Sequence, residues 1–253
     1  MKLLVLVAAL LAGCATGQSR DSTVDPATLT SSTPRVDVIP ADKIAYTFYA
    51  ASKTPAPTVL LGHGCAGIVP IQTEDYKQDL LKWGYNVVVV DSWTPRGIKS
   101  VCKSLVPYYH PPARMTEFYE VAKKIKSNPA HNGRLGYIGW SHGGSLGLSL
   151  ASQDRTFSAV VSYYPGCGPR ATAGRTMQAP TLMHLAGNDT WTPIKWCNDI
   201  DGNVIKLVHP NSGHAFDIRA PYRVYMGEVL EYNATADRTA REATRRFLEE
   251  FLQ

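Results

Sequence analysis

The feature that most constrains the fold is a regular alternation of short apolar runs with longer stretches of helical spacing. The apolar runs are rich in Val, Leu, Ile and Tyr and span residues 58–61, 86–90, 135–139, 157–163, 181–186 and 204–208. Residues 36–39 and 44–49 are candidates for one or two edge strands, and helical spacing occurs over residues 73–83, 114–127, 141–152 and 236–252. This order predicts an α/β fold with a mostly parallel central sheet covered by helices on both faces.

The first fourteen residues have a different composition and are typical of a secretory signal. Lys2 supplies a positive start, residues 3–11 are uninterrupted Leu, Val and Ala, and Leu-Ala-Gly-Cys14 closes the segment. The segment resembles the bacterial lipoprotein lipobox, in which the cysteine is acylated after cleavage. We therefore expect residues 1–13 to be a lipoprotein signal peptide and Cys14 to carry a lipid. An ordinary signal peptide with a coincidental cysteine is the alternative.

The remaining chain reads as a tether followed by one domain. Residues 14–35 are mostly Ser, Thr, Asp, Gly and Pro, too polar to bury a core, so we expect a flexible tether. Residues 36–253 are long enough for a single catalytic domain. Only some fifteen residues follow Tyr164 before the next strand, which leaves little room for a large cap at that position, and we expect none. Ala15, in place of an aspartate, fits an outer-membrane lipoprotein facing the periplasm if the host is Gram-negative.

The charge balance argues against a nucleic-acid partner. The chain carries a formal charge of +5, and removing residues 1–13 takes away Lys2 and no acid, which leaves +4. This excess is small and scattered, without a Lys/Arg block longer than two residues. The expected partners are a small-molecule substrate and, through the lipid anchor, a membrane; the sequence does not fix the oligomeric state.

Four cysteines remain once Cys14 is set aside, and an exported protein can keep them oxidised. Four cysteines allow three pairings. The expected order of strands puts Cys65 and Cys102 after two neighbouring strands and Cys167 and Cys197 after two others. We therefore favour the pairs 65–102 and 167–197, with buried free thiols as the alternative. Metal binding is not expected, because no Cys-x-x-Cys pair or close Cys/His cluster is present.

The densest chemical signal is a strand that runs into Gly139-Trp-Ser-His-Gly143 and then into a helix. Glycines at both ends of this motif permit a very tight turn, which lifts the hydroxyl of Ser141 above the sheet. A plain glycine-rich crossover or a phosphate-binding loop is the alternative. Neither the dinucleotide pattern Gly-x-Gly-x-x-Gly nor a P-loop lysine pattern accompanies the motif.

An acid and a histidine follow this serine, each after a predicted strand. Asp189 comes after residues 181–186 and His214 after residues 204–208. The order Ser, Asp, His is typical of the α/β-hydrolase fold. We expect Ser141 to be the nucleophile, His214 its general base and Asp189 the group that orients the imidazole. Competing candidates are Asp199 and Asp201 for the acid and His209 for the base.

An oxyanion formed at Ser141 needs backbone N–H donors. The helix that starts after Ser141 offers the N–H of His142, and the loop Gly62-His-Gly-Cys65 offers the N–H of Cys65. Histidines 63, 110, 131 and 184 are expected to have structural or surface roles.

Over residues 58–252 the chain resembles the dienelactone hydrolase family. The matching motifs are His63-Gly-Cys-Ala-Gly67, Asp91-Ser-Trp-Thr-Pro-Arg-Gly97, Gly139-Trp-Ser-His-Gly-Gly144, Asp189-Thr-Trp-Thr-Pro193 and Gly213-His-Ala-Phe-Asp217. The resemblance implies hydrolysis of an ester or lactone with no cofactor. Dienelactone hydrolases proper have a cysteine where this chain has Ser141, and a serine enzyme handles ordinary esters. An Asp91–Arg96 ion pair, or a substrate carboxylate on Arg96, is a further expectation.

The sequence thus predicts a serine hydrolase that cleaves a carboxylic ester or lactone through an acyl-serine intermediate. A peptidase or acyltransferase could use the same three residues. A non-catalytic envelope binding protein that keeps the hydrolase fold is the alternative from another class.

Overall fold

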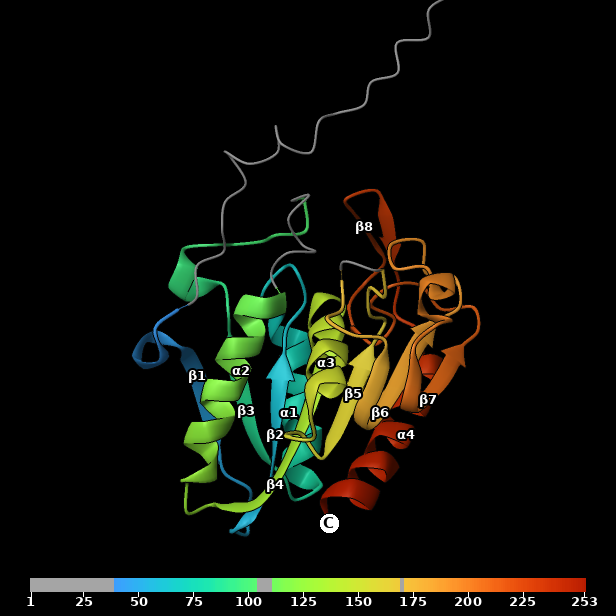
Figure 1. Cartoon of the computed structure of the whole chain (residues 1–253). Helices are drawn as coiled ribbons and strands as arrows, with labels where there is room; N and C mark the ends of the chain where they lie inside the picture. Colours follow the sequence, from blue (N-terminus) through green and yellow to red (C-terminus); the bar gives the residue numbers. More distant parts are fainter. Residues whose placement is uncertain (1–38, 104–110, 169–170) are drawn as a thin grey trace, which may run out of the picture. The chain divides into compact units, whose positions relative to one another are not determined.

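The computed structural model describes residues 39–103, 111–168 and 171–253 (Figure 1). The predicted signal peptide, the acylation site Cys14, the tether and His110 lie outside the described residues. The described residues all belong to one compact unit, residues 35–253.

A seven-stranded sheet with the order β1-β3-β2-β4-β5-β6-β7 forms the centre of this unit. Strand β1 (Ala45–Tyr49) runs antiparallel to β3, and all other neighbouring pairs are parallel. The parallel strands are β2 (Ala56–Gly62), β3 (Asn86–Asp91), β4 (His131–Trp140), β5 (Ala159–Tyr163), β6 (Thr176–Ala186) and β7 (Asp201–His209). Each of the six predicted central strands is therefore confirmed, and the sequence located their carboxyl ends better than their starts.

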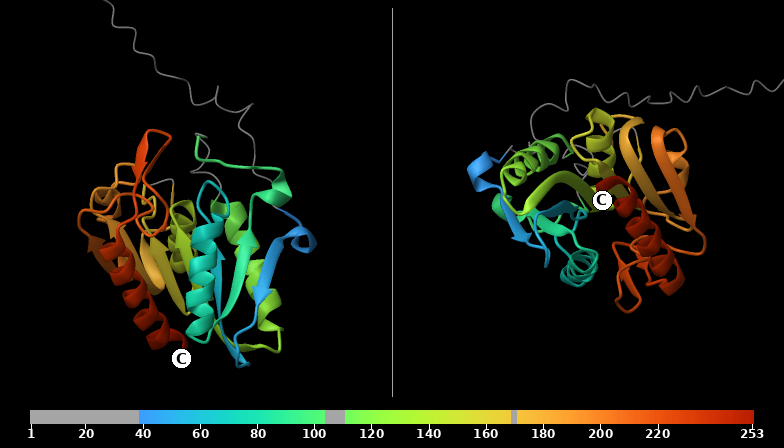
Figure 2. Two further views of the ribbon diagram at one scale, coloured as in Figure 1. Left: turned by 180° about the vertical axis from the view of Figure 1, so that it is seen from behind. Right: turned by 90° about the horizontal axis from the view of Figure 1, so that it is seen from below.

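The α-helices of the described residues cover both faces of the sheet (Figure 2). They are α1 (Pro70–Lys82), α2 (Pro111–Lys126), α3 (His142–Gln153) and α4 (Ala234–Leu252). Residues such as Phe118 and Leu146 place α2 and α3 in one apolar core, and Leu80 and Phe247 place α1 and α4 in the core on the opposite face. The sheet is thus buried on both sides, as the apolar run in β3 predicts.

Helix α4 shows how local sequence and packing agree. Its first turn is capped by Asn233, whose side chain accepts from the N–H groups of Thr235 and Ala236. Ala240 and Phe247, seven residues apart and so on one face of the helix, are buried in the apolar core on this side of the sheet. Burying one side chain of the size of Phe247 contributes about 1.5–3 kcal/mol.

A two-stranded hairpin, β8 (Arg223–Tyr225) and β9 (Glu228–Leu230), was not predicted. Its turn residues Met226 and Gly227 have φ values of 59° and 87°, the left-handed pair that a tight two-residue hairpin turn requires. Strands of three residues are too short to show alternation, so periodicity alone cannot reveal them.

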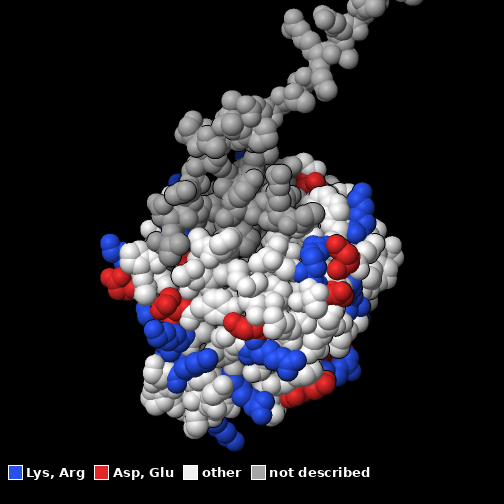
Figure 3. Space-filling model, in the orientation of Figure 1, with Lys and Arg blue, Asp and Glu red and all other residues white. Residues whose placement is uncertain are grey.

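The described loops contain no large cap over the carboxyl end of the sheet, in agreement with the expected fold class. On the face shown in Figure 3, Lys and Arg side chains lie among Asp and Glu side chains. None of the described helices is both long and apolar enough to cross a membrane.

Candidate active site

The turn between β4 and α3 holds Ser141 in a constrained backbone conformation, with φ 53° and ψ −115°. A Cβ atom on Gly143 would lie 2.0 Å from the carbonyl oxygen of Gly62, and one on Gly139 would lie 2.3 Å from the carbonyl oxygen of Gly143. Only glycine fits at these two positions, which explains why the motif needs them.

Ser141, His214 and Asp189 form a continuous hydrogen-bonded chain. The Ser141 Oγ lies 3.0 Å from His214 Nε2, and His214 Nδ1 lies 2.8 Å from Asp189 Oδ2. Each residue follows a strand of the parallel sheet, β4, β7 and β6 respectively, so all three meet at the carboxyl edge. The structure thus brings together the three residues that the sequence singled out.

Asp189 is held by the loop that follows it. Its Oδ1 accepts from the N–H groups of Trp191 and Thr192 at 2.9 and 2.8 Å, and its Oδ2 accepts from the Thr192 hydroxyl at 2.8 Å. Burial by itself would raise the pKa of Asp189, but the bonds from His214 and Thr192 outweigh it and leave the pKa below its usual value. The carboxylate is therefore kept ionised and fixed in direction.

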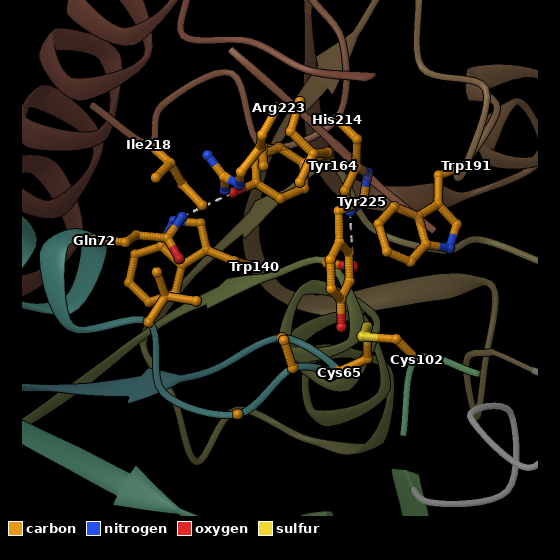
Figure 4. A pocket seen from close by; sticks show the side chains of 17 residues that line it. Cys65, Gln72, Cys102, Trp140, Tyr164, Trp191, His214, Ile218, Arg223 and Tyr225 are labelled. Atoms are coloured by element: carbon orange, nitrogen blue, oxygen red, sulfur yellow. Dashed lines mark hydrogen bonds between the residues drawn. A yellow bond between two sulfur atoms is a disulfide. The ribbon is translucent and has the colours of Figure 1, made fainter. Parts of the chain in front are cut away.

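The imidazole of His214 lies between two aromatic rings. Its centroid is 4.7 Å from the ring of Tyr164 and 4.9 Å from that of Trp191 (Figure 4). Two hydrogen bonds fix the ring of Tyr164: its hydroxyl donates to buried Asp217 at 2.6 Å and accepts from Gln72 at 2.8 Å. Asp217 belongs to a motif noted in the sequence, but its partners could not be identified there.

The competing candidates lie elsewhere. Asp199 is exposed and pairs with Arg175, and Asp201 begins β7, at the edge of the sheet opposite Ser141. His209 is 3.0 Å from His184 within a buried pair of rings. None of the three contacts Ser141.

The loop after β2 lies against Ser141. An ideal Cβ on Gly64 would be 3.6 Å from the Cβ of Ser141. The carbonyl of the next residue, Cys65, accepts from Trp93 Nε1 at 3.1 Å and from the Val101 N–H at 2.9 Å. Among the described residues, none accepts a hydrogen bond from the Cys65 N–H. This amide and the N–H of His142, at the start of α3, are the two groups expected to hold an oxyanion.

Both favoured disulfides are present in the structure. Cys65 is bonded to Cys102 and Cys167 to Cys197, each with a Cα–Cα distance of 5.0 Å. The first joins the loop after β2 to the loop after β3 and lines the cavity beside Ser141. The second joins the loops after β5 and β6, and neither of its cysteines lines that cavity.

A cavity of about 220 Å³ opens beside Ser141 and His214 (Figure 4). Most of its walls are apolar or aromatic, and the lining side chains include Trp140, Tyr164, Trp191, Ile218, Tyr225 and Leu230. Tyr225 and Leu230 come from the unpredicted hairpin. Arg223, from the same hairpin, is the one Lys, Arg, Asp or Glu side chain among the described residues that line the cavity. The cavity suits an uncharged, mainly apolar group next to the hydroxyl of Ser141.

Other polar groups around the site have structural partners. His63 is buried and accepts from the Ser92 N–H at 3.0 Å; burial and the nearby charge of Arg114 lower its pKa to about 3, so it is neutral. The prediction of an ion pair between Asp91 and Arg96 was wrong. Asp91 instead accepts from the N–H groups after it, and Arg96 pairs with Glu117 on α2. Sequence could not reveal this, because Glu117 carries no motif.

Within residues 39–103, 111–168 and 171–253, no group of three or more His, Cys, Asp or Glu side chains is arranged to hold a metal ion.

The model of the dienelactone hydrolase family matches residues 44–252. The chain belongs to the dienelactone hydrolase family. Comparison with curated protein sequences gave no match.

Solved structures agree with this membership at the level of the fold. A dienelactone hydrolase from Anabaena variabilis is 16% identical with a TM-score of 0.61, covering 83% of this chain and 93% of that one. A dienelactone hydrolase-like promiscuous phosphotriesterase from metagenomic libraries is 16% identical with a TM-score of 0.63, covering 83% and 100%. A cold-adapted esterase from an Arctic intertidal metagenomic library is 15% identical with a TM-score of 0.60, covering 83% and 89%. Membership of this family, shown by the match over residues 44–252, makes the chain a hydrolase of the ester or lactone type.

Proposed function

We propose that this hydrolase cleaves carboxylic esters through an acyl-serine intermediate. The observation that supports this most directly is the chain from Ser141 Oγ to His214 to Asp189, with spacings of 3.0 and 2.8 Å, next to an apolar cavity. Such spacings are within reach for proton transfer between a hydroxyl and an imidazole.

In the proposed reaction, Ser141 Oγ attacks the ester carbonyl carbon while His214 Nε2 takes the hydroxyl proton. The N–H groups of Cys65 and His142 hold the carbonyl oxygen as it becomes negative. When the tetrahedral intermediate collapses, the bond to the alcohol breaks, and His214 gives its proton to the departing oxygen. Water then attacks the acyl-serine, with His214 as base, and releases the acid and free Ser141. Asp189 stabilises the imidazolium in both halves of the cycle.

The substrate class follows from the cavity. A volume of about 220 Å³ with aromatic walls accommodates a small apolar acyl or alcohol group. The serine in the elbow favours ordinary esters over a dienelactone. No cofactor takes part in the proposed reaction.

A fluorophosphonate probe, which reacts with activated serines, tests this proposal. We expect the protein to be labelled and to hydrolyse p-nitrophenyl esters, and Ser141→Ala to lose both properties. Ser152→Ala is the matched control, since Ser152 lies on the same helix and its hydroxyl donates to the carbonyl of Ser149 rather than to a member of the Ser141–His214–Asp189 chain. Equal labelling of Ser141→Ala would disprove the assignment.

The same assay separates the alternatives. A peptidase would cleave matched p-nitroanilides at rates comparable to the esters, and an acyltransferase would form a new ester when an added alcohol competes with water. A binding protein would show neither labelling nor hydrolysis, yet would melt at a higher temperature with ligand in both wild type and Ser141→Ala.

We further propose that the protein is exported and anchored by a lipid on Cys14, in the outer membrane facing the periplasm if the host is Gram-negative. The lipobox sequence ending at Cys14 supports this, and two disulfides suit an oxidising compartment. Expressed in a bacterial host, the full chain should fractionate with membranes and gain acyl mass on its amino-terminal peptide. Cys14→Ala should lose both properties; an unchanged mass and distribution would contradict the anchor.

A further inference from the structure

Arg114, in the first turn of α2, is a fully buried arginine with neutral partners. Its exposed fraction is 0%. Its guanidinium donates from Nε to Ser92 Oγ at 3.1 Å and from Nη2 to the carbonyl of His63 at 3.0 Å, and its Nη1 lies 2.7 Å from His142 Nδ1. Within the described part of the chain it forms no ion pair, because the nearby carboxylate of Glu117 pairs with Arg96. Burying an arginine without a carboxylate is costly, so this arrangement requires an explanation.

Two of these partners belong to the segments that carry the proposed oxyanion donors. His63 comes two residues before Cys65 in the loop after β2, and His142 directly follows Ser141 at the start of α3. One guanidinium therefore bridges two segments that are 79 residues apart in sequence by the numbers of His63 and His142. Since an arginine can only donate, His142 Nδ1 must be the acceptor, and the imidazole is neutral with its proton on Nε2.

The indole ring of Trp93 packs against Arg114 and against both histidines that Arg114 contacts. Its ring centroid is 5.2 Å from that of His63 and 5.7 Å from that of His142, and the Arg114 guanidinium lies 5.0 Å from it. The indole N–H of Trp93 donates to the carbonyl of Cys65. The planar guanidinium is thus held rigidly, with little freedom to follow a displaced loop.

We infer that Arg114 is a positioning residue that fixes the distance between the Cys65 and His142 amides, without touching the substrate. This inference rests on the proposed function. An oxyanion hole works only when its donors lie about 2.7–3.1 Å from the position that the negative oxygen will occupy. A small change in the spacing of the two segments weakens the transition state more than the bound ester, and so lowers kcat rather than raising KM.

The primary test compares Arg114→Gln and Arg114→Lys with wild type, using p-nitrophenyl ester hydrolysis by the full chain. Neither side chain can reach all three partners, so we expect kcat to fall roughly 10- to 100-fold in both, less than the roughly 10²- to 10³-fold loss when one donor is removed outright, while KM changes less than about twofold. Affinity for a boronic acid, whose tetrahedral adduct mimics the oxyanion, should fall by a similar factor.

Arg241→Lys is the matched control. Arg241 is 6% exposed, pairs with Asp79 and Asp237, and packs 3.9 Å from the ring of Tyr76, on the opposite face of the sheet. It therefore shares the burial of Arg114 but does not contact the segments beside Ser141. We expect this variant to melt at a lower temperature and to keep the kcat and KM of wild type when folded.

His142→Ala keeps the backbone amide of residue 142 and removes only the side chain that meets Arg114. This variant tests the positioning role of Arg114 even if the Arg114 variants themselves do not fold. We expect the same selective loss of kcat. Where Arg114→Gln folds, the double variant Arg114→Gln/His142→Ala should lose little more than Arg114→Gln alone, because the contact between the two side chains is already broken in that variant.

The inference is overturned if the folded variants keep the wild-type kcat, or if Arg241→Lys loses kcat to the same degree. These outcomes require an active wild type with a labelled Ser141. A wild type that neither hydrolyses esters nor labels would instead disprove the proposed function, so the two failures are distinguishable.

Discussion

The conformation of Ser141 shows most directly what a single residue contributes to this site. A positive φ of 53° is unfavourable for a side chain larger than glycine, and such strain persists only where the surroundings enforce it. Here the enforcing contacts are the close approach of Gly143 to Gly62 and the bond from the Ser141 N–H to the carbonyl of Tyr163. The strain orients the hydroxyl toward His214 Nε2.

Asp189→Asn tests the role of the acid at the same scale. The amide can keep the contacts to the Trp191 and Thr192 N–H groups, but it cannot stabilise an imidazolium or hold the Nδ1 proton in the same way. We expect kcat for ester hydrolysis to fall about 10³- to 10⁴-fold. Steady-state kinetics at neutral pH provide the measurement. A loss below tenfold would point to a different acid.

The residues of the candidate active site lie on loops that follow the strands of the sheet. Two disulfides connect loops at this edge of the sheet. Cys65–Cys102 links the loop after β2 to that after β3, and Cys167–Cys197 links the loops after β5 and β6. Their sequence separations are 37 and 30 residues, so the two bonds restrict the unfolded chain to a similar degree. By loop entropy each contributes about 3 to 4 kcal/mol to the free energy of unfolding.

Cys102→Ala and Cys197→Ala should therefore lose similar stability but differ in activity. We expect urea unfolding to show comparable losses of up to about 4 kcal/mol in both. Only Cys102→Ala should also lower kcat, because Cys65 then loses one of the contacts that fix its amide beside Ser141. Equal kcat values in the two folded variants would show that the disulfide has no influence on the site.

At the scale of the whole molecule, the packing around the sheet keeps several histidines neutral. His184 is 0% exposed and lies 3.0 Å from both His209 and the hydroxyl of Thr244. Burial, followed by the influence of His209, lowers the pKa of His184 well below its ordinary value of 6.5, and burial and Arg114 lower that of His63 to about 3. Neither ring accepts a proton in the folded protein near neutral pH.

This predicts an acid-sensitive fold. Both histidines have a lower pKa when folded than when unfolded, so their contribution to stability is complete above about pH 6.5 and is lost as the pH falls below it. Each adds about 1.4 kcal/mol per pH unit to the slope of the unfolding free energy, once the pH is well below 6.5. Urea unfolding at pH 7, 6 and 5 measures this slope. His184→Gln should have a shallower slope than wild type, and identical slopes would contradict the prediction.

The sequence by itself determined the order of strands and helices, because burial imposes a period that can be read locally. It also determined which residues reach the carboxyl edge of the sheet. Ser141, Asp189 and His214 each lie in the turn or loop that follows a strand, and parallel strands present these loops on one edge. The same reasoning paired the four cysteines as they are found.

Only the tertiary structure decided which side chains meet across the molecule. The bridge from Arg114 to His63 and His142, the support of Tyr164 by Asp217, and the pairing of Arg96 with Glu117 join residues without a common motif or period. The hairpin that contributes Arg223, Tyr225 and Leu230 to the cavity lining likewise has strands too short to show alternation. These contacts depend on the packing of α2, of the loops and of the hairpin against the sheet, which a local pattern does not encode.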